Sequence, residues 1–372
     1  SFGDYFKEDA IPWAWELVTR GYGLPLERLW VSVYLDDDEA YRLWRQVGVP
    51  EARIVRLGKE TNFWEIGVGP CGPCSEIHFD FGAEHACGPN CQVGCDCDRF
   101  LEIWNLVFIQ FYRDDAGNYT PLERKGIDTG MGLERITAVL QGGRSAFDTD
   151  LFRDVIEEIT GLLRMDYRTS GDVRRAVRVI ADHARAATFA IADGALPSNE
   201  GRGYVIRRLL RRAARFGKLF GCEEPFLDRV ALRVIDTMGE IYPELRQQKR
   251  HVIRTIRMEE ERFSETLSLG TEILGRMIAE TWSKGEKTLP GEAAFKLYDT
   301  YGFPLELTEE ICAEEGLTVD REGFKEAMAQ QRVRARQSRE ATEYLGGRER
   351  FYREIRETGV TTRFTGYYTL EE

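Results

Sequence analysis

The spacing of apolar residues changes near residue 150, and this change constrains the fold more than any other feature of the 372-residue sequence. Before it, β-branched and aromatic residues gather in short runs bounded by Gly, Pro and Asp, a pattern typical of strands. These runs are Leu29–Leu35, Arg53–Leu57 and Leu101–Tyr112, and short helices are expected at Glu8–Arg20 and Asp38–Val47. The first part is therefore predicted to be a sheet with helices segregated around it.

After residue 150, apolar residues recur at spacings of three and four with charges between them, which indicates amphipathic helices. The predicted helices are Leu151–Leu163, Val173–Asp193, Tyr204–Phe220, Pro225–Ile241 and Pro243–Lys284. The segment Thr361–Leu370 returns to strand-like alternation. We therefore predict an α+β chain of three parts: residues 1–145 with the sheet, residues 146–345 all-helical, and residues 346–372 as a connector that leads into a β-rich domain.

The composition limits the class of protein. Hydrophobic residues make up 42% and charged residues 31% of the chain, and no apolar run approaches the roughly 18 residues that a membrane span needs. The start lacks the basic and apolar stretches of a secretory signal, so we expect a cytoplasmic location and no membrane partner. The formal charge of −12 argues against uniform binding to nucleic acid but is compatible with a local basic face.

Six of the eight cysteines lie between residues 71 and 97, which favours a local feature over a disulfide scaffold. Cys71 and Cys74 have the spacing of a zinc half-site or a redox pair, but we favour a structural role in a turn. Four further thiols follow within eleven residues: Cys87, Cys91, Cys95 and Cys97. Either a tetrahedral Zn²⁺ orders this loop, with His85 as a substitute ligand, or the thiols are reduced in a flexible insertion.

The segment DTGMGLER at residues 128–135 is predicted to be a tight bend followed by a helix. In such a bend, Asp128 can accept hydrogen bonds from an ammonium group, and Arg135 can offer a fork of donors to a phosphate. Taken alone, the pattern is more often an ordinary strand-to-helix turn with a surface arginine.

Neighbouring motifs make this segment specific. The strings are NFWEIG at 62–67, GPCGPCSEIH at 69–78, LEIWNLVF at 101–108 and DTGMGLER at 128–135. Together they resemble the catalytic domain of bacterial-type alanyl-tRNA synthetases, class II enzymes built on an antiparallel sheet, and the last string resembles class II motif 3. The resemblance implies that alanine is activated with ATP and Mg²⁺ and then transferred to the 3′ end of tRNA(Ala).

The resemblance also implies roles for individual residues. The alanine site would contain Trp64, Asn105, Val107, Asp128 and Gly130. Asp128 would hold the substrate ammonium group, and Arg135 would bind the ATP phosphates. Core packing is the alternative for Trp64 and Val107. For Glu76 three roles are open: a Mg²⁺ ligand, a contact to ATP, or a carboxylate satisfied by nearby backbone.

The sequence departs from the family pattern at its start. The string SFGDYFK at 1–7 resembles the tail of class II motif 2, so the motif 2 arginine and motif 1 are expected upstream of Ser1. We therefore expect a fragment that is weak or inactive in adenylate formation by itself. The alternative is a non-catalytic, synthetase-derived tRNA-binding protein.

A basic run in the helical part suggests contact with RNA. Arg207, Arg211 and Arg215 recur every four residues, so one helix is predicted to present a cationic face. A solvated or ion-paired surface is the usual explanation of such runs. In the resembling family, however, the nearby string PSNEGRGY at 197–204 meets the tRNA acceptor stem near the G3:U70 pair, which implies that this face contacts tRNA.

Single contacts to the acceptor stem follow from the same resemblance. Asn199 and, in the string LYDTYGFP at 297–304, Asp299 would read base edges, while Arg202 would hold a phosphate. Asn199 can instead cap the helix predicted to begin near Gly203, so both interpretations stay open.

Overall fold

The computed structural model describes residues 1–95, 97 and 99–341, and contacts between residues divide the chain into two compact units. The first unit contains residues 1–185 and 229–247, and the second contains residues 186–228 and the chain from residue 248 onward. Residues 146–185 thus group with the sheet, so this division does not coincide with the predicted boundary at residue 145. The predicted third part, residues 346–372, lies outside the described residues.

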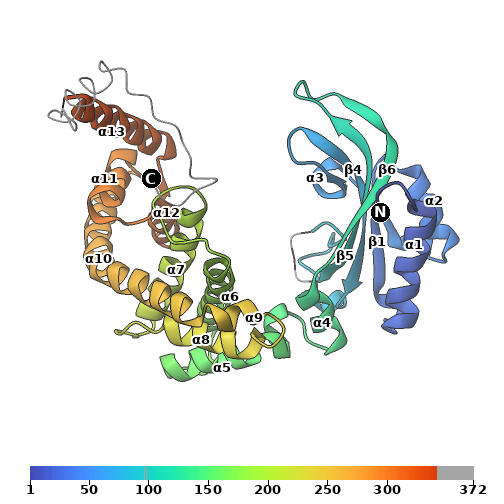
Figure 1. The fold of residues 1–372 in the computed structure, drawn as a ribbon, viewed down its shortest axis with the longest axis horizontal. Helices are drawn as coiled ribbons and strands as arrows, with labels where there is room; N and C mark the ends of the chain where they lie inside the picture. The colour runs from blue at the N-terminus through green and yellow to red at the C-terminus, as the bar shows by residue number, and fades with distance from the viewer. Residues whose placement is uncertain (96, 98, 342–372) are drawn as a thin grey trace, which may run out of the picture. The chain divides into compact units, whose positions relative to one another are not determined.

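A six-stranded sheet forms the centre of the first unit (Figure 1). The strand order is β2-β1-β4-β5-β6. The sixth strand, β3, pairs only with β4 and lies outside this order. β1 and β2 are parallel, and the other paired strands are antiparallel. The strands are β1 Leu29–Tyr34, β2 Ile54–Leu57, β3 Phe63–Trp64, β4 Gly69–Asp80, β5 Phe100–Arg113 and β6 Tyr119–Met131. The α+β class is confirmed, with a mixed sheet in place of a purely antiparallel one.

Two of the longest strands do not match the apolar runs of the sequence. β4 and β6 contain Gly, Pro and charged residues, so they lack the alternation that marks β1 and β5. Their extended form depends on neighbours, because β4 lies between β1 and β5, and β6 pairs with β5. Cys71 and Cys74, which we expected in a turn, consequently lie within β4.

Two helices cover one face of the sheet, α1 Lys7–Glu16 and α2 Asp38–Gln46 (Figure 1). Ile77, Leu106 and Phe108 of the sheet belong to one apolar core with the helix residues Trp15 and Trp44. The rings of these two tryptophans meet edge to face, 6.1 Å apart. Removal of this apolar surface from water, at about 25 cal/mol per Å², is the main force that holds the layers together.

A buried lysine ties α1 to α2. Lys7 is 1% exposed, and its Nζ lies 2.7 Å from Asp37 Oδ1 and 3.0 Å from Glu39 Oε2. Asp37 also caps α2 by accepting the N–H of Ala40 at 3.1 Å. Removing one partner of a buried ion pair costs about 3–5 kcal/mol, so this contact fixes how α1 lies against α2.

Helices dominate the chain after the sheet. The helices that belong wholly or largely to the first unit are α4 Leu133–Leu140, α5 Asp150–Leu163, α6 Gly171–Ala192, α8 Leu227–Met238 and α9 Pro243–Gln247. A short helix, α3 Lys59–Asn62, precedes β3. No helix among the described residues is both long and apolar enough to cross a membrane.

The second unit is built mainly from helices. They are α7 Gly201–Leu219, α10 Lys249–Ser283, α11 Gly291–Tyr301, α12 Leu305–Glu314 and α13 Arg321–Ala341. Two-residue strands, β7 Thr288–Leu289 and β8 Thr318–Val319, also pair in parallel there. The prediction of a purely helical part is therefore wrong in this detail, because segments this short carry no recognisable periodicity.

Glu260 of α10 binds the backbone at the start of α8. Its Oε2 accepts the N–H groups of Phe226 and Leu227 at 3.1 and 2.9 Å. Burial raises the pKa of Glu260 from 4.5 to about 7, although these hydrogen bonds oppose the shift. The folded chain therefore keeps a proton that the unfolded chain loses, and this contribution to stability disappears as the pH rises from about 4.5 through 7.

We expect Glu260→Gln to reduce the pH dependence of stability. The amide does not titrate, and its oxygen still accepts the backbone N–H groups, so the fall in unfolding free energy between about pH 5 and about pH 8 should be smaller than in the parent chain. Urea denaturation at both pH values measures the difference. Glu240→Gln, at an exposed position outside α10, serves as the control. Identical pH dependence in the parent and in Glu260→Gln would contradict this assignment.

Candidate functional site

The face of the sheet opposite α1 and α2 carries most of the predicted alanine-site residues in two adjacent rows. Strand register aligns Glu76 of β4 with Asn105 of β5, and Asn105 with Gly130 of β6. The next row aligns Val107 of β5 with Asp128 of β6. Residues two positions apart on a strand share a face and lie about 6.6 Å apart, so the two rows form one surface.

A hydrogen-bond network fixes the carboxylate of Glu76. Its Oε2 accepts from Ser32 Oγ at 3.1 Å, and its Oε1 accepts from Asn105 Nδ2 at 3.0 Å. Asn62 Nδ2 donates to the Ser32 hydroxyl at 3.0 Å, and His78 Nε2 lies 3.0 Å from the same oxygen. Side chains rather than backbone thus hold Glu76, and the full burial of Ser32 and Asn62 makes the network rigid.

Two amide oxygens in this network have no hydrogen-bond partner in the part of the chain that the structure describes. They are Asn62 Oδ1 and Asn105 Oδ1, and both are buried. A buried acceptor without a donor costs about 1–3 kcal/mol, so such an atom marks a place for a donor or a cation from outside. Carboxylate and amide oxygens are also ligands that Mg²⁺ prefers, and Glu76 and Asn105 therefore fit that ion.

A pocket of about 660 Å³ brings two of the predicted alanine-site residues together. Trp64 of β3 and Asp128 of β6 both line it, and so do Pro70 and Ile109. Trp64 is 38% exposed, so its ring is not simply part of the core. Val107 is only 8% exposed and lies beside Asp128 in register, which agrees with the packing alternative for that residue.

The predicted bend at residues 128–135 is wrong for its first half. Asp128 and Gly130 lie in an extended strand, because β6 stays paired with β5 as far as Met131. The chain turns only at Gly132, which precedes the first residue of α4. Strand pairing overrides the turn preference of the glycines, and it places Asp128 at a defined position in a row of the sheet.

Arg135 lies in the first turn of α4, and a carboxylate already neutralises it. Its Nη1 donates to Glu102 Oε2 at 2.9 Å and to the Glu102 carbonyl oxygen at 3.1 Å. The side chain of Arg135 is nevertheless 48% exposed. A phosphate could therefore reach it, in competition with Glu102.

The three arginines predicted to form a cationic face on α7 contact carboxylates of the second unit. Arg211 Nε donates to Glu259 Oε1 at 2.8 Å, and Arg207 pairs with the same oxygen at 3.1 Å. Arg215 is buried and donates to Glu314 Oε2 at 2.6 Å. The ion-paired alternative therefore describes these side chains in the structure, and their contact with tRNA stays a prediction.

The predicted acceptor-stem residues are exposed. Asn199 precedes α7 but does not cap it, because Glu200 is the N-cap residue and no side chain caps the helix. The capping alternative is thus wrong, and Asn199 Oδ1 instead accepts a hydrogen bond from Arg207. Arg202, in the first turn of α7, and Asp299, on α11, are likewise open to solvent.

The cysteine loop brings its thiols together. The Sγ atoms of Cys87, Cys91 and Cys95 lie within 4.8 Å of one another, and those of Cys91 and Cys97 are 3.6 Å apart. Four thiolates around a tetrahedral Zn²⁺ would be about 3.8 Å apart, so the loop fits this ion. The ring of His85 lies near Glu84 instead, with its Nε2 3.8 Å from Glu84 Oε1.

Cys71 and Cys74 are different, because both thiols are buried in β4. Burial raises the pKa of Cys74 to about 12, and it also raises the pKa of Cys71. A thiol that rarely ionises is a poor redox nucleophile and a poor metal ligand, which supports the structural role expected from the sequence.

Sequence reasoning missed three members of the Glu76 network: Ser32, Asn62 and His78. Ser32 is the one small polar residue in the apolar run of β1, and this isolated serine was a usable signal. His78 follows Glu76 by two positions and so shares its face. Asn62 ends the short helix α3, and nothing in its local sequence indicates its contact with Ser32.

Comparison with known proteins finds relatives that match the whole chain. The family model described as tRNA synthetases class II (A) matches residues 1–372. This chain is similar over its whole length to three alanine–tRNA ligases. The identity is 62% to that of Pelotomaculum thermopropionicum, 61% to that of Desulforamulus reducens and 59% to that of Carboxydothermus hydrogenoformans. The chain spans 42% or 43% of the length of these relatives. Because the family model covers the chain from end to end, the chain belongs to the class II (A) tRNA synthetases.

Proposed function

We propose that this chain forms the alanine site and part of the ATP site of a cytoplasmic alanine–tRNA ligase, which activates alanine with ATP and transfers it to tRNA(Ala). The observation that carries the proposal is the meeting of Trp64 and Asp128 in one pocket, beside the row of Glu76, Asn105 and Gly130. Relatives with the printed name alanine–tRNA ligase, at 59–62% identity, support this choice of substrate.

Each side chain suits one part of the substrates. The exposed carboxylate of Asp128 can accept hydrogen bonds from the ammonium group of alanine, and the ring of Trp64 limits the room for its side chain. Glu76 and Asn105 would provide one or two oxygen ligands to the Mg²⁺ that accompanies ATP. When bound, Mg²⁺ supplies positive charge beside the phosphates. Arg135 would add a second positive group.

The reaction requires no nucleophile from the protein. A carboxylate oxygen of alanine attacks the α-phosphorus of ATP, and pyrophosphate leaves with the electron pair of the broken P–O bond. The ribose hydroxyl of tRNA then displaces AMP from the alanyl group. The chain's residues would act by holding the reactants in position and by placing charge beside the phosphates.

Asp128→Asn should lower kcat/KM for alanine in alanine-dependent pyrophosphate exchange by about 100-fold or more. The reason is the loss of a charge-assisted hydrogen bond, which contributes roughly 1.5–3 kcal/mol, together with the loss of charge opposite the ammonium group. The assay uses a full-length protein that carries this sequence, and the KM for ATP should change little.

Asp115→Asn, in the exposed loop between β5 and β6, is the matched control and should behave like the parent. Near-normal exchange in Asp128→Asn would overturn the assignment of the alanine pocket. An unmodified full-length protein that binds tRNA(Ala) but forms no adenylate would favour the non-catalytic alternative.

The proposed contact with the tRNA acceptor stem gives a second prediction. The exposed amide of Asn199 can donate to and accept from base edges, an interaction that typically contributes about 1–3 kcal/mol. Asn199→Ala should therefore lower kcat/KM for charging tRNA(Ala) by about tenfold or more, with pyrophosphate exchange unchanged. Arg202→Ala, which removes a phosphate contact, should weaken cognate and non-cognate tRNA alike. Equal losses of charging and exchange in Asn199→Ala would mean that Asn199 is structural.

We also propose that Cys87, Cys91, Cys95 and Cys97 hold one structural Zn²⁺. The support is the spacing of their sulfur atoms in a loop with little apolar content of its own. Chain expressed with added zinc and purified without chelators should contain about one zinc per chain by elemental mass spectrometry. Cys95→Ser should lower that content, and Cys222→Ser, outside the loop, should not. A parent chain without stoichiometric zinc would contradict the proposal.

A further inference from the structure

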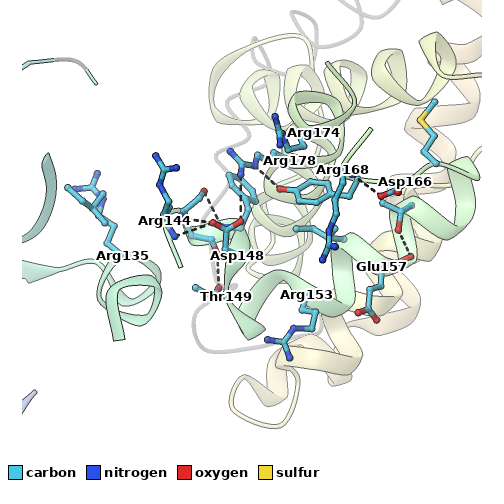
Figure 2. Close-up of a pocket in the computed structure, with 18 residues that line it drawn as sticks. Arg135, Arg144, Asp148, Thr149, Arg153, Glu157, Asp166, Arg168, Arg174 and Arg178 are labelled. Carbon is cyan, nitrogen blue, oxygen red and sulfur yellow. Dashed lines mark hydrogen bonds and ion pairs between the residues drawn. The ribbon is translucent and has the colours of Figure 1, made fainter. Parts of the chain in front are cut away.

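A broad groove lies in the first unit, formed mainly by helices (Figure 2). Its volume is about 1220 Å³, and its walls are the loop before α5, α5 itself, the segment 165–168 and the start of α6, with Leu101 and Arg135 at one edge. Three of its lining residues carry carboxylates, and six are arginines: Arg135, Arg144, Arg153, Arg168, Arg174 and Arg178. The groove is thus a positive region in a chain whose formal charge is −12.

Four of the six groove arginines have no ion-pair partner among the described residues, whereas Arg135 pairs with Glu102 and Arg178 with Asp148. Arg144, Arg153, Arg168 and Arg174 are exposed, and their guanidinium groups make no ion pair or hydrogen bond with any residue that the structure describes. Two of the three carboxylates bind backbone N–H groups. Asp148 Oδ2 accepts the N–H groups of Arg144 and Ser145 at 3.2 and 3.0 Å, and Asp166 Oδ1 accepts the N–H of Arg168 at 2.9 Å.

Arg178, the second groove arginine on α6, holds the walls together. Arg178 Nε donates to the hydroxyl of Tyr167 at 2.7 Å, and its Nη2 lies 3.7 Å from Asp148 Oδ1. Its guanidinium also lies 5.4 Å from the centre of the Phe147 ring. These contacts join α6 to the loops on both sides of α5, so the groove is a packed feature of the fold rather than a gap between mobile side chains.

We propose that this groove binds the phosphate backbone of RNA; the identity of that RNA as tRNA rests on the proposed function. The guanidinium fork of arginine matches the oxygens of a phosphate, and four such groups have no ion-pair partner in the described part of the chain. The groove also exceeds the roughly 300–1000 Å³ of ordinary small-molecule sites and has a polar lining. The arginines of α7 are different, since phosphate contact there would first have to break buried ion pairs.

The test compares two variants of equal charge. The groove variant changes Arg144, Arg153, Arg168 and Arg174 to Gln. The control variant changes four exposed arginines outside the groove to Gln: Arg42, Arg250, Arg254 and Arg262. None of the eight side chains has a partner in the described part of the chain, so both variants should fold, which circular dichroism and thermal unfolding check. Binding of tRNA(Ala) and of a non-cognate tRNA is then measured over a range of salt concentrations.

The groove variant should bind both tRNAs about tenfold or more weakly, and the slope of log affinity against log salt should fall by about 3, because each phosphate contact contributes roughly 0.7–0.9 to it. The control variant should keep the slope of the parent. Equal slopes in parent and groove variant, equal losses in both variants, or no RNA binding by the parent would each overturn the groove proposal. A lack of preference for tRNA(Ala), with the groove effect intact, would count against the proposed function alone.

Discussion

The register of β4 against β5 is the constraint on which the rest of the site depends. A slip of one residue would turn each side chain to the other face of the sheet, and Glu76 would then point into the apolar core. Two irregularities interrupt the pairing, one on each side of Glu76. Gly72 lies at the first irregularity and fixes its position. A Cβ at residue 72 would lie 1.9 Å from the carbonyl oxygen of Phe108, so only glycine lets these strands approach so closely.

The correct register gives the sheet two faces with different tasks. One face packs against α1 and α2, and the Lys7–Asp37 pair fixes those helices in place. This apolar core can support a second face whose polar groups contribute little to stability. On that face, the network around Glu76 leaves amide oxygens without donors, an arrangement that costs free energy but holds ligand-binding groups in one geometry.

The local sequence predicted those helices and strands in which the spacing of apolar residues matches the buried face. β1, β5 and most helices were placed within a few residues, whereas β4 and β6 were missed because their conformation is set by strands on either side. The site shows the same division. Family strings predicted Asp128 and Trp64 for one site, and both line one pocket. The ion pairs of α7, in contrast, join residues 48 and 99 positions apart, and no local pattern contains that information.

The two sets of arginines show what decides whether a cation is available to a partner. In α7, carboxylates of other helices reach Arg211 and Arg215, and the pairs serve to hold helices together. In the groove, Asp148 and Asp166 are tied to backbone N–H groups of turns, where acidic side chains stabilise the chain locally. Carboxylates are present in both places, but among the described lining residues of the groove Asp148 pairs with Arg178 and leaves four arginines without an ion pair. Net charge therefore says little about binding, because a partner meets the local balance of charges, and in the groove six arginines outnumber three carboxylates.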